Sequence, residues 1–510
     1  LYRHLIMDEI WATQRAEYGY QDVRPHPLLA DFVGHPYVDI RASFSSFVPS
    51  SLSAELRDKL VRFYIQWLEQ NPHLHDKVEF DVVPTCYALD FDRWQQRLVQ
   101  HAGLTQDEIT RLELGLKAIT QQAFGRVDND LDTIGKLNQR YTEIISTPLN
   151  PLAKAALLLE DCKRYGTLPF AHLARAGFIA VTLLKSAVSK TIISQNAFDG
   201  FMAGIRTVSH QLSEDADAVK NGRLAWQVFV EKYAHLRPGT YDIKSESYGA
   251  NPEHYLRPLT EQTSHAIHQP DNQAWLQERE HFRQALHKVG FNLDLKAIES
   301  FLHQAIEGRE YAKFMFSRTQ STALDLIRDW GESQDLNVND LAYLKLNEIL
   351  DFKAQLSLDS QTFEKVKERI EARKVEHSLI KSIELPPLIC SEQDFDVFQY
   401  PHSQANYVGT KPIMAECINL SAQSNNPDNL NLAGLVVMIP QADPGYDWLF
   451  GRNIAGLVTM YGGANSHMAI RAAEFGLPAA IGIGEARYHA LNTAKVLELD
   501  PASRQLKVIR

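Results

Sequence analysis

The chain has 510 residues, a formal net charge of −11 at pH 7, 45% hydrophobic residues and 23% charged residues. Its acidic balance argues against a nucleic-acid partner, because binding to a phosphate backbone needs a basic surface. No apolar run approaches the ~18 residues of a membrane span, so no membrane partner is expected. The composition is that of a soluble globular protein, long enough for about two to four domains.

The four cysteines, at positions 86, 162, 390 and 417, lie far apart and fit no zinc or redox motif. They are typical of reduced thiols, which predicts a cytoplasmic protein. The 19 histidines form no cluster with metal-ligand spacing, so no metal site is expected. The chain opens at Leu1 without a signal-like pattern and begins directly on an apolar-periodic run. We therefore expect a fragment of a longer protein.

Residues 1–385 are predicted to form a large, mainly α-helical domain. The apolar residues repeat with the i, i+3, i+4 spacing of amphipathic helices in eight stretches. These stretches are 56–68, 105–123, 151–158, 173–189, 221–233, 272–289, 293–316 and 321–330. Three irregular segments between them, 24–49, 79–91 and 235–256, are rich in aromatic and polar residues, as ligand-binding loops often are.

The first irregular segment places Asp39, Arg41 and Ser43 among aromatic residues. An arginine beside hydroxyl groups suits a carboxylate or phosphate, because the guanidinium pairs with two oxygens at once. The alternative is that Asp39 and Arg41 form a salt bridge that only fixes the loop. These three residues are candidates for substrate binding.

The third irregular segment gathers His235, Arg237, Tyr241 and Asp242 around a Pro-Gly turn. A turn with so many titratable groups is a candidate pocket wall. Ordinary hydrogen bonding within the loop is the alternative. We include these four residues in the predicted substrate site.

Residues 386–395 are predicted to be an interdomain linker, because Pro386 and Pro387 forbid a continuing helix. Beyond it the pattern changes to short β-like runs at 413–420, 432–440, 454–460, 479–483, 496–499 and 506–509. Residues 396–510 are therefore predicted to form a small α/β domain, connected by a linker that permits it to swivel.

The most specific motif lies where one of these strands ends. Gly462 and Gly463 break the strand and let backbone N–H groups approach an anion. Ser466 is a candidate N-cap, and the apolar spacing that follows predicts a helix with His467 in its first turn. A helix N-terminus stabilises a phosphate and keeps the imidazole neutral and nucleophilic. The alternative, a capping or packing histidine, is the ordinary role of an isolated histidine.

The whole pattern resembles the phosphohistidine swivelling domain of the phosphoenolpyruvate synthase and pyruvate phosphate dikinase family. The residues that carry the resemblance are Thr459, Gly462, Gly463, Ser466, His467, Ala469, Ile470, Gly476 and Pro478, with 443–445 and 448–450 ahead of them. The resemblance implies that His467 carries a phosphoryl group and that Thr459, Gly462, Gly463 and Ser466 support it. One departure is Ala473, where many relatives have arginine. The arginine here is Arg471, which leaves the cationic partner of the phosphate open.

Softer motifs in residues 1–385 extend the resemblance. Residues 233–242 resemble a Tyr-Gly-His-Arg-Gly stretch in the central domain of phosphotransferases such as rifampin phosphotransferase. Residues 307–310 resemble the Arg-Glu helix of the same domains, which adds Arg309 and Glu310 to the predicted substrate site. The N-terminal segments 11–18, 24–27, 38–44 and 76–81 look like the surface-polysaccharide-associated subgroup, whose best-understood member is an L-glutamine kinase of capsular phosphoramidate biosynthesis.

The resemblance implies an ATP-dependent kinase or dikinase with L-glutamine as the suspected acceptor. ATP and Mg²⁺ would be bound by an ATP-grasp domain, which has no counterpart in this sequence, so the chain is expected to need that domain as a partner. Only 43 residues follow His467, too few for the barrel that binds phosphoenolpyruvate in the synthase. Another small-molecule kinase of the dikinase type, a phosphocarrier without an acceptor, and a binding module with a decayed histidine domain are the alternatives.

Overall fold

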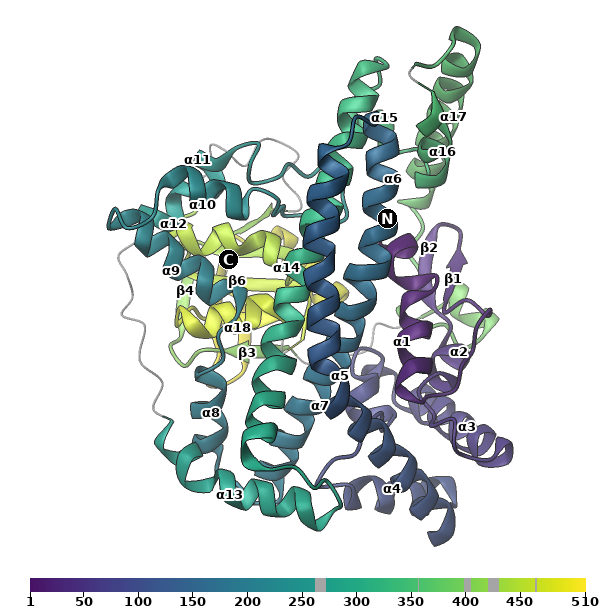
Figure 1. Cartoon of the computed structure of the whole chain (residues 1–510), viewed down its shortest axis with the longest axis vertical. Coiled ribbons are helices and arrows are strands. Elements are labelled where there is room, and N and C mark those ends of the chain that lie inside the picture. The colour runs from purple at the N-terminus through teal and green to yellow at the C-terminus, as the bar shows by residue number, and fades with distance from the viewer. Residues whose placement is uncertain (262–271, 356, 399–404, 421–430, 464–465) are drawn as a thin grey trace. The chain divides into compact units, whose positions relative to one another are not determined.

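The computed structural model describes residues 1–510 except 262–271, 356, 399–404, 421–430 and 464–465 (Figure 1). The described chain forms two compact units. Unit 1 contains Leu1–Val208 and His268–Glu392, and unit 2 contains Ser209–Ile267 and Gln393–Arg510. This division differs from the predicted one because 209–267 groups with the C-terminal residues rather than with the rest of 1–385. The boundary at Glu392 lies within the predicted linker 386–395.

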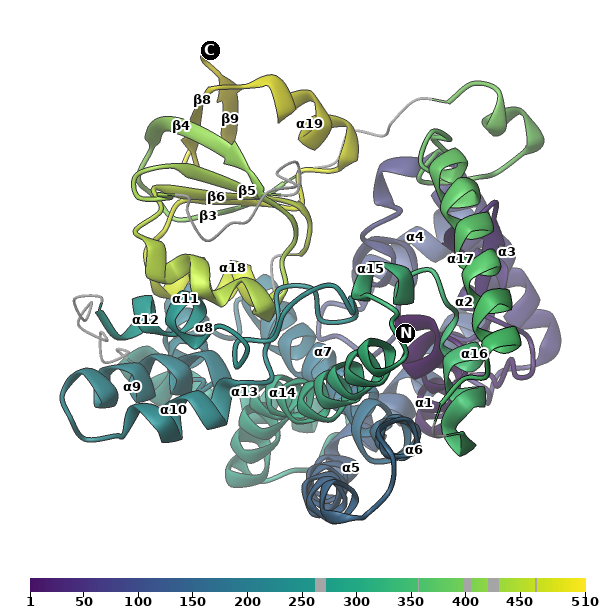
Figure 2. The same ribbon diagram turned by 90° about the horizontal axis from the view of Figure 1, so that it is seen from above.

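Unit 1 is built around four long helices that lie side by side in both views (Figures 1 and 2). These are α5 (Gln106–Ser146), α6 (Pro151–Asp161), α7 (Leu168–Ser189) and α14 (Leu295–Ser333). The other elements of unit 1 are η1 (Arg3–Met7), α1 (Ile10–Tyr18), β1 (Leu29–Phe32), β2 (His35–Val38), α2 (Ile40–Ser45), α3 (Ala54–Gln70), η2 (Pro72–Leu74), η3 (Val78–Val82), α4 (Asp92–Ala102), η4 (Cys162–Thr167), α8 (Gln195–Ala203), α13 (Gln273–Lys288), α15 (Val338–Leu341), α16 (Leu346–Leu350), η5 (Asp351–Ala354) and α17 (Ser360–Ile380).

The sequence of α5 explains both where the helix begins and which of its faces is buried. Thr105 caps the first turn by accepting from the Glu108 backbone N–H, and the Glu108 side chain bonds back to the Thr105 N–H. Its buried residues then recur three and four positions apart, as at Ile109, Leu112 and Leu116. The predicted helices 293–316 and 321–330 form one continuous helix, α14. The apolar pattern is interrupted between them by Thr319 and Gln320, which are polar but buried within the helix.

One helical stretch contradicts the expectation that no run is long enough to cross a membrane. The stretch Pro151–Ser189 meets that criterion by length and composition, among the described residues. In the folded chain, 67% of its most apolar window is buried. Burial of this extent is what the core helices of a bundle show, and α6 and α7 both contact α14.

The predicted irregular segment 24–49 contains regular structure. Strands β1 and β2 form an antiparallel hairpin in which Leu29 pairs with Val38, and α2 follows at once. The two turn residues, Val33 and Gly34, have φ values of 52° and 84°. Positive φ at both positions gives the turn that matches the twist of a two-residue hairpin. The prediction of a loop was wrong here because valine gives no turn signal.

The pairing of α16 with α17 gives unit 1 a testable pH dependence. Glu348 pairs with Arg373 at 2.6 Å and Arg369 at 2.9 Å, and the hydrogen bond from Arg373 lowers the Glu348 pKa to about 2. A lowered carboxylate pKa stabilises the fold above the unfolded value near 4.3, and this contribution disappears as pH falls through about 2. We expect Glu348→Gln to cost about 1 kcal/mol of unfolding free energy at pH 7 and nothing near pH 2. Urea melts of both proteins across this pH range measure the difference, and a constant gap would contradict it.

Unit 2 contains a seven-stranded sheet in the order β3-β7-β6-β5-β4-β8-β9. Its four central strands are parallel and the others pair antiparallel at the two edges. The strands are β3 (Asn406–Val408), β4 (Ile413–Asn419), β5 (Val436–Gln441), β6 (Gly456–Tyr461), β7 (Ala479–Ile481), β8 (Val496–Asp500) and β9 (Gln505–Val508). The predicted small α/β domain is therefore present.

Two helices cover opposite faces of this sheet (Figure 2). Val436 and Met438 of β5 pack in one core with Tyr488 of α19 (Glu485–Ala490). Val437 and Ile439 alternate with them and are buried on the opposite face of the sheet, and α18 (His467–Glu474) contacts β3 and β7. Burial on both faces explains why β5 is continuously apolar. The other helices of unit 2 are α9 (Val208–Lys220), α10 (Trp226–Tyr233), α11 (Pro252–Tyr255), α12 (Arg257–Glu261), η9 (Pro444–Arg452) and η10 (Leu491–Thr493), and η6 (Glu392–Phe395) spans the boundary of the units.

Candidate functional site

The candidate site is the connection from β6 to α18. The strand ends at Tyr461, and α18 begins at His467 with Ser466 in an extended N-cap conformation (φ −71°, ψ 157°). The prediction of a strand, a glycine turn and a helix with His467 in its first turn is therefore confirmed. The imidazole of His467 lies outside the described part of the structure. Its backbone lies beyond the carboxyl end of a parallel strand, where α/β folds bind ligands.

Three loops meet at this end of the sheet, one after each of β5, β6 and β7. A Cβ on Gly462 would lie 2.7 Å from Ala442 Cβ, and one on Gly482 would lie 2.2 Å from Gly462 O. Both glycines also have positive φ, 137° and 69°. Only glycine combines these conformations with such close approach, so the loops present backbone rather than side chains at this point. Backbone N–H groups at a helix N-terminus are the donors that a phosphate binds.

Thr459 fixes the loops to one another. Its hydroxyl accepts from the Gly482 N–H at 2.9 Å and donates to the Tyr461 carbonyl at 2.9 Å. The side chain is fully buried. The structure therefore gives Thr459 a positioning role beneath the loop. Ser466 differs, because its Oγ is buried without a hydrogen-bond partner among the described residues.

Arg471 lies one turn after His467 on the same helix. Its guanidinium is 1% exposed, lies 3.3 Å from Asp447 Oδ1 and donates to Ser213 Oγ at 3.1 Å. It also stacks within 4.6 Å of the centre of the Phe475 ring. Arg471 is therefore a buried structural cation, held by η9 and α9. An arginine that binds phosphate would have an accessible guanidinium, whereas that of Arg471 is bonded to Asp447 and Ser213.

The predicted pocket wall at 235–242 belongs to unit 2 and packs on the segment before the motif. Tyr248 donates to the Gly445 carbonyl at 2.9 Å, and a Cβ on Gly445 would lie 1.8 Å from the Arg237 carbonyl oxygen. Burial raises the Tyr248 pKa well above its usual value. This close approach explains the glycine in Asp443-Pro-Gly445.

Within this wall the predicted residues have different environments. His235 and Arg237 are buried, and Arg237 donates to the Ser245 carbonyl at 2.9 Å. Tyr241 is half-buried, and the exposed Asp242 accepts from the Lys244 backbone N–H. Arg237 and Asp242 thus take part in the loop's own hydrogen bonds, as the alternative interpretation expected. Their role in substrate binding stays a prediction.

The other predicted substrate residues lie in unit 1. Asp39 caps α2 by accepting from the Ala42 N–H, and its second oxygen lies 3.3 Å from His26. Arg41 is exposed and makes no salt bridge with Asp39 among the described contacts, so the predicted loop staple is absent there. Ser43 is buried, 3.4 Å from an Arg15 nitrogen.

Arg309 and Glu310 occupy successive positions on α14. Their charged atoms are 3.9 Å apart, and the arginine side chain is 39% exposed while the glutamate is mostly buried. The nine predicted substrate residues are divided between the two units, with five in unit 1 and four in unit 2. No single compact unit contains them all, so the pocket that they were predicted to share stays a prediction.

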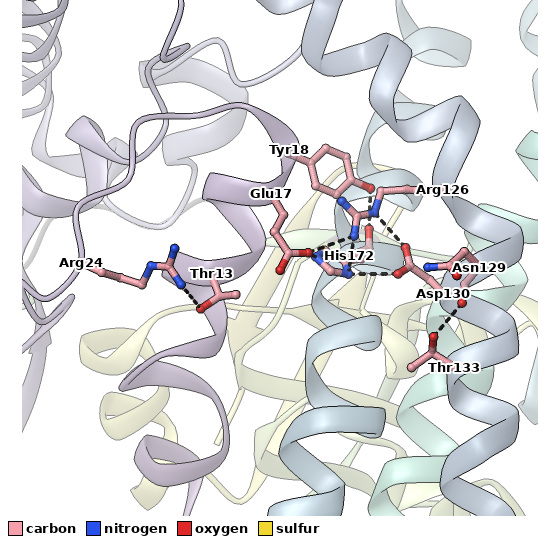
Figure 3. Close-up of polar contacts among 9 residues, drawn as sticks. All are labelled: Thr13, Glu17, Tyr18, Arg24, Arg126, Asn129, Asp130, Thr133 and His172. Carbon is pink, nitrogen blue, oxygen red and sulfur yellow. Dashed lines mark hydrogen bonds and ion pairs between the residues drawn. The ribbon is translucent and has the colours of Figure 1, made fainter.

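Sequence analysis missed a buried ionic network between α1, α5 and α7 (Figure 3). His172 on α7 lies 3.0 Å from Asp130 through Nδ1 and 3.0 Å from Glu17 through Nε2. Arg126 bonds to Asp130 at 3.0 Å, reaches His172 Nδ1 at 2.8 Å and lies 4.8 Å from the centre of the Tyr18 ring. The bond to His172, followed by the nearby arginine, lowers the Glu17 pKa.

The position of the proton on the His172 ring determines which hydrogen bond its Nδ1 makes in this network. Nδ1 can accept from Arg126 or donate to Asp130, but it does only one of these at a time. The sequence did contain a signal for this network: His172 and Arg175 lie one turn apart in the first half of α7, which is otherwise apolar.

In the described part of the chain, no group of three or more histidine, cysteine or acidic residues is placed to hold a metal ion.

Comparison with known proteins identifies the C-terminal part of the chain. Residues 432–504 match the family model of the mobile domain of PEP-utilising enzymes. This range begins shortly before β5, ends between β8 and β9, and contains the whole candidate site. No curated protein matches the chain. The match supports the family of PEP-utilising and pyruvate phosphate dikinase-like enzymes, and it indicates a phosphotransferase of the kinase or dikinase type that carries phosphohistidine.

Proposed function

We propose that the chain carries a phosphoryl group on His467 and transfers it to a small polar acceptor, the amide nitrogen of L-glutamine. The observation that carries this proposal is the position of His467 at the first residue of α18, directly after a glycine turn, within the matched mobile domain. The unpaired N–H groups of that helix end and the partial positive charge there favour a bound phosphoryl group.

The overall reaction that we propose converts ATP, water and acceptor into AMP, inorganic phosphate and phosphorylated acceptor. ATP first pyrophosphorylates a ring nitrogen of His467 and releases AMP, and hydrolysis of the pyrophosphoryl group then releases phosphate. In the last step the bond between this nitrogen and phosphorus breaks, a new bond forms to the acceptor nitrogen, and a base takes the amide proton. A covalent carrier divides one difficult transfer into easier steps.

For the acceptor we propose two alternative sets of residues, one in each unit. In unit 1, Arg41 would pair with the α-carboxylate and Asp39 with the ammonium group. In unit 2, Arg237 and Asp242 would take these roles, and His235 would accept the amide proton. Ser43, Tyr241, Arg309 and Glu310 complete the proposed sets. The exposed side chains of Arg41 and Asp242 are accessible to a ligand, which supports these two assignments most directly.

In this proposal ATP and Mg²⁺ are bound by a partner domain and not by this chain. We propose that an ATP-grasp domain binds both and loads His467, and that the reaction takes place in the cytoplasm. The family alternatives are an acceptor of the rifampin phosphotransferase or phosphoenolpyruvate synthase type. A phosphocarrier that passes its phosphoryl group to another protein is the alternative of a different class.

The test loads the histidine chemically, so that it needs only this chain. The chain is incubated with potassium phosphoramidate, desalted, and then mixed with L-glutamine while phosphorus NMR spectra are recorded. We expect an acid-labile phosphohistidine signal that decays as a product signal with a P–N bond appears. His467→Asn is expected to lose one phosphohistidine signal and the whole product signal, while signals from other histidines that phosphoramidate labels are common to both proteins and do not decay with L-glutamine.

Each other result has a definite meaning. Equal labelling of wild type and His467→Asn would overturn the carrier role of His467. Phosphohistidine that forms at His467 but does not decay faster with L-glutamine would keep the carrier and redirect the search to another acceptor.

A further inference from the structure

Two buried arginines of unit 1 lie beside the same aromatic ring. Arg15 on α1 is 7% exposed and Arg175 on α7 is 3% exposed. The centres of their guanidinium groups lie 3.7 Å and 5.4 Å from the centre of the Phe47 ring. Two cations are therefore close together in the helical interior, where like charges repel with little screening.

The charges in this cluster do not balance. Arg175 pairs with Glu79 at 2.5 Å and also donates to Thr85 Oγ1 at 3.1 Å. Arg15 donates to a hydroxyl oxygen, Ser46 Oγ, at 2.5 Å, so its bonded partner is neutral. Burial lowers the Arg15 pKa to about 10, although Glu79 opposes this. One carboxylate facing two guanidinium groups leaves about one positive charge without a counterion.

The same cluster has buried hydrogen-bonding groups that are not used. Among the described residues, Nε of Arg15 and Nε of Arg175 are buried without a hydrogen-bond partner. Each of these groups has lost its hydration and gained no hydrogen bond in exchange. A network kept only for stability would be expected to satisfy these groups.

The cluster also reaches the surface. Glu79 lies on η3, and 27% of its side chain is exposed while it contacts Arg175. Behind Glu79 the cluster holds an excess positive charge, two buried Nε–H groups without a partner and two serine hydroxyls that contact Arg15. The His172 network differs, because each of its charged groups is paired with another.

We propose that Arg15 and Arg175 form the oxyanion-binding site of this chain, and that they hold the carboxylate of its small acceptor. In this site the unused Nε–H groups of the two arginines donate to the carboxylate. Guanidinium groups pair with carboxylates more strongly and more directionally than ammonium groups do. The assignment of the ligand as the acceptor rests on the proposed function, and it adds Arg15 and Arg175 to Arg41 and Arg237 as candidates for the carboxylate partner. Ser43, which was already predicted, belongs to this site.

The test measures binding in a chain that cannot be phosphorylated at position 467. Isothermal titration calorimetry of the full His467→Asn chain uses three probes: L-glutamine, 4-aminobutanamide, which is the same molecule without its α-carboxylate, and inorganic phosphate. We expect L-glutamine to bind and the decarboxylated analogue to bind at least about 10-fold more weakly. Arg15→Lys and Arg175→Lys should each weaken L-glutamine at least about 10-fold. The matched control is Arg328→Lys, which changes an α14 arginine that is 23% exposed and paired with Asp325, and it should leave binding unchanged.

The outcomes separate this proposal from the carrier role of His467. Phosphate binding that depends on both arginines, without L-glutamine binding, would keep the oxyanion site and identify phosphate as its ligand. If neither probe binds, or if both folded lysine variants bind like the parent, the proposal is overturned, whatever the phosphohistidine experiment shows. Should the lysine variants fail to fold by circular dichroism, Ser46→Ala serves instead, with about 5-fold weaker binding expected and unchanged binding counting against the site.

Discussion

Replacing Gly482 with alanine is expected to lower the unfolding free energy of the sheet in unit 2 by more than about 3 kcal/mol. The residue has φ 69°, which costs a residue with a Cβ about 1–2 kcal/mol. In addition, the new Cβ would lie 2.2 Å from Gly462 O, so the backbone of one loop has to move. That movement breaks the 2.9 Å bond from the Gly482 N–H to Thr459. Hydrogen exchange of the amides in β5, β6 and β7 measures this local free energy.

Two other glycines of the same domain distinguish the effect of the positive φ from the effect of the close backbone contact. Gly476 has φ 60°, but no heavy atom of the described residues lies within 4 Å of the place that a Cβ would take, so Gly476→Ala should cost only about 1 kcal/mol. Gly463 has neither positive φ nor a close neighbour in the described part of the chain, and its change to alanine should cost less than about 0.5 kcal/mol. Equal exchange in all three variants would show that the contact between the loops after β6 and β7 is not tight.

Much of the α/β domain could be predicted from local sequence. The apolar runs marked the central strands, the two glycines marked the end of β6, and Ser466 marked the start of α18. These features depend on residues within one turn or one strand of each other. The strand β3 was missed, because only Asn406–Val408 pairs at the sheet edge and three residues give no periodicity.

Features that join distant residues could not be predicted in the same way. The site at Arg15 and Arg175 depends on contacts across 160 positions and includes Glu79 from a third segment. The sequence shows polar residues in apolar helices, but not which of them meet. For the same reason the helices at 209–261 were assigned to the helical domain, although Tyr248 and Ser213 bond to residues of the C-terminal segment.

Replacing Arg471 with methionine is expected to destabilise unit 2 by about 3–5 kcal/mol. The change removes the cation that lies 3.3 Å from Asp447, a carboxylate that is itself only 2% exposed. Methionine preserves much of the apolar contact with Phe450 and Phe475, so the loss comes mainly from the charge left in the interior. Denaturant unfolding, followed by hydrogen exchange of α18, measures the effect.

A second change tests whether the buried charge is the cause. Asp447→Asn in the Arg471→Met background removes that charge and should restore at least about 1 kcal/mol, since a neutral amide is less costly to bury than an unpaired carboxylate. Arg487→Met is the control, because Arg487 is exposed and bonds to a backbone carbonyl, and it should cost less than about 0.5 kcal/mol. If the double variant were no more stable than Arg471→Met, the stacking of the guanidinium on the two phenylalanine rings would have to account for the stability, and the ion pair with Asp447 would not. The result matters for the carrier, because α18 presents His467 and its first turn is held in place by the packing of the residues that follow it.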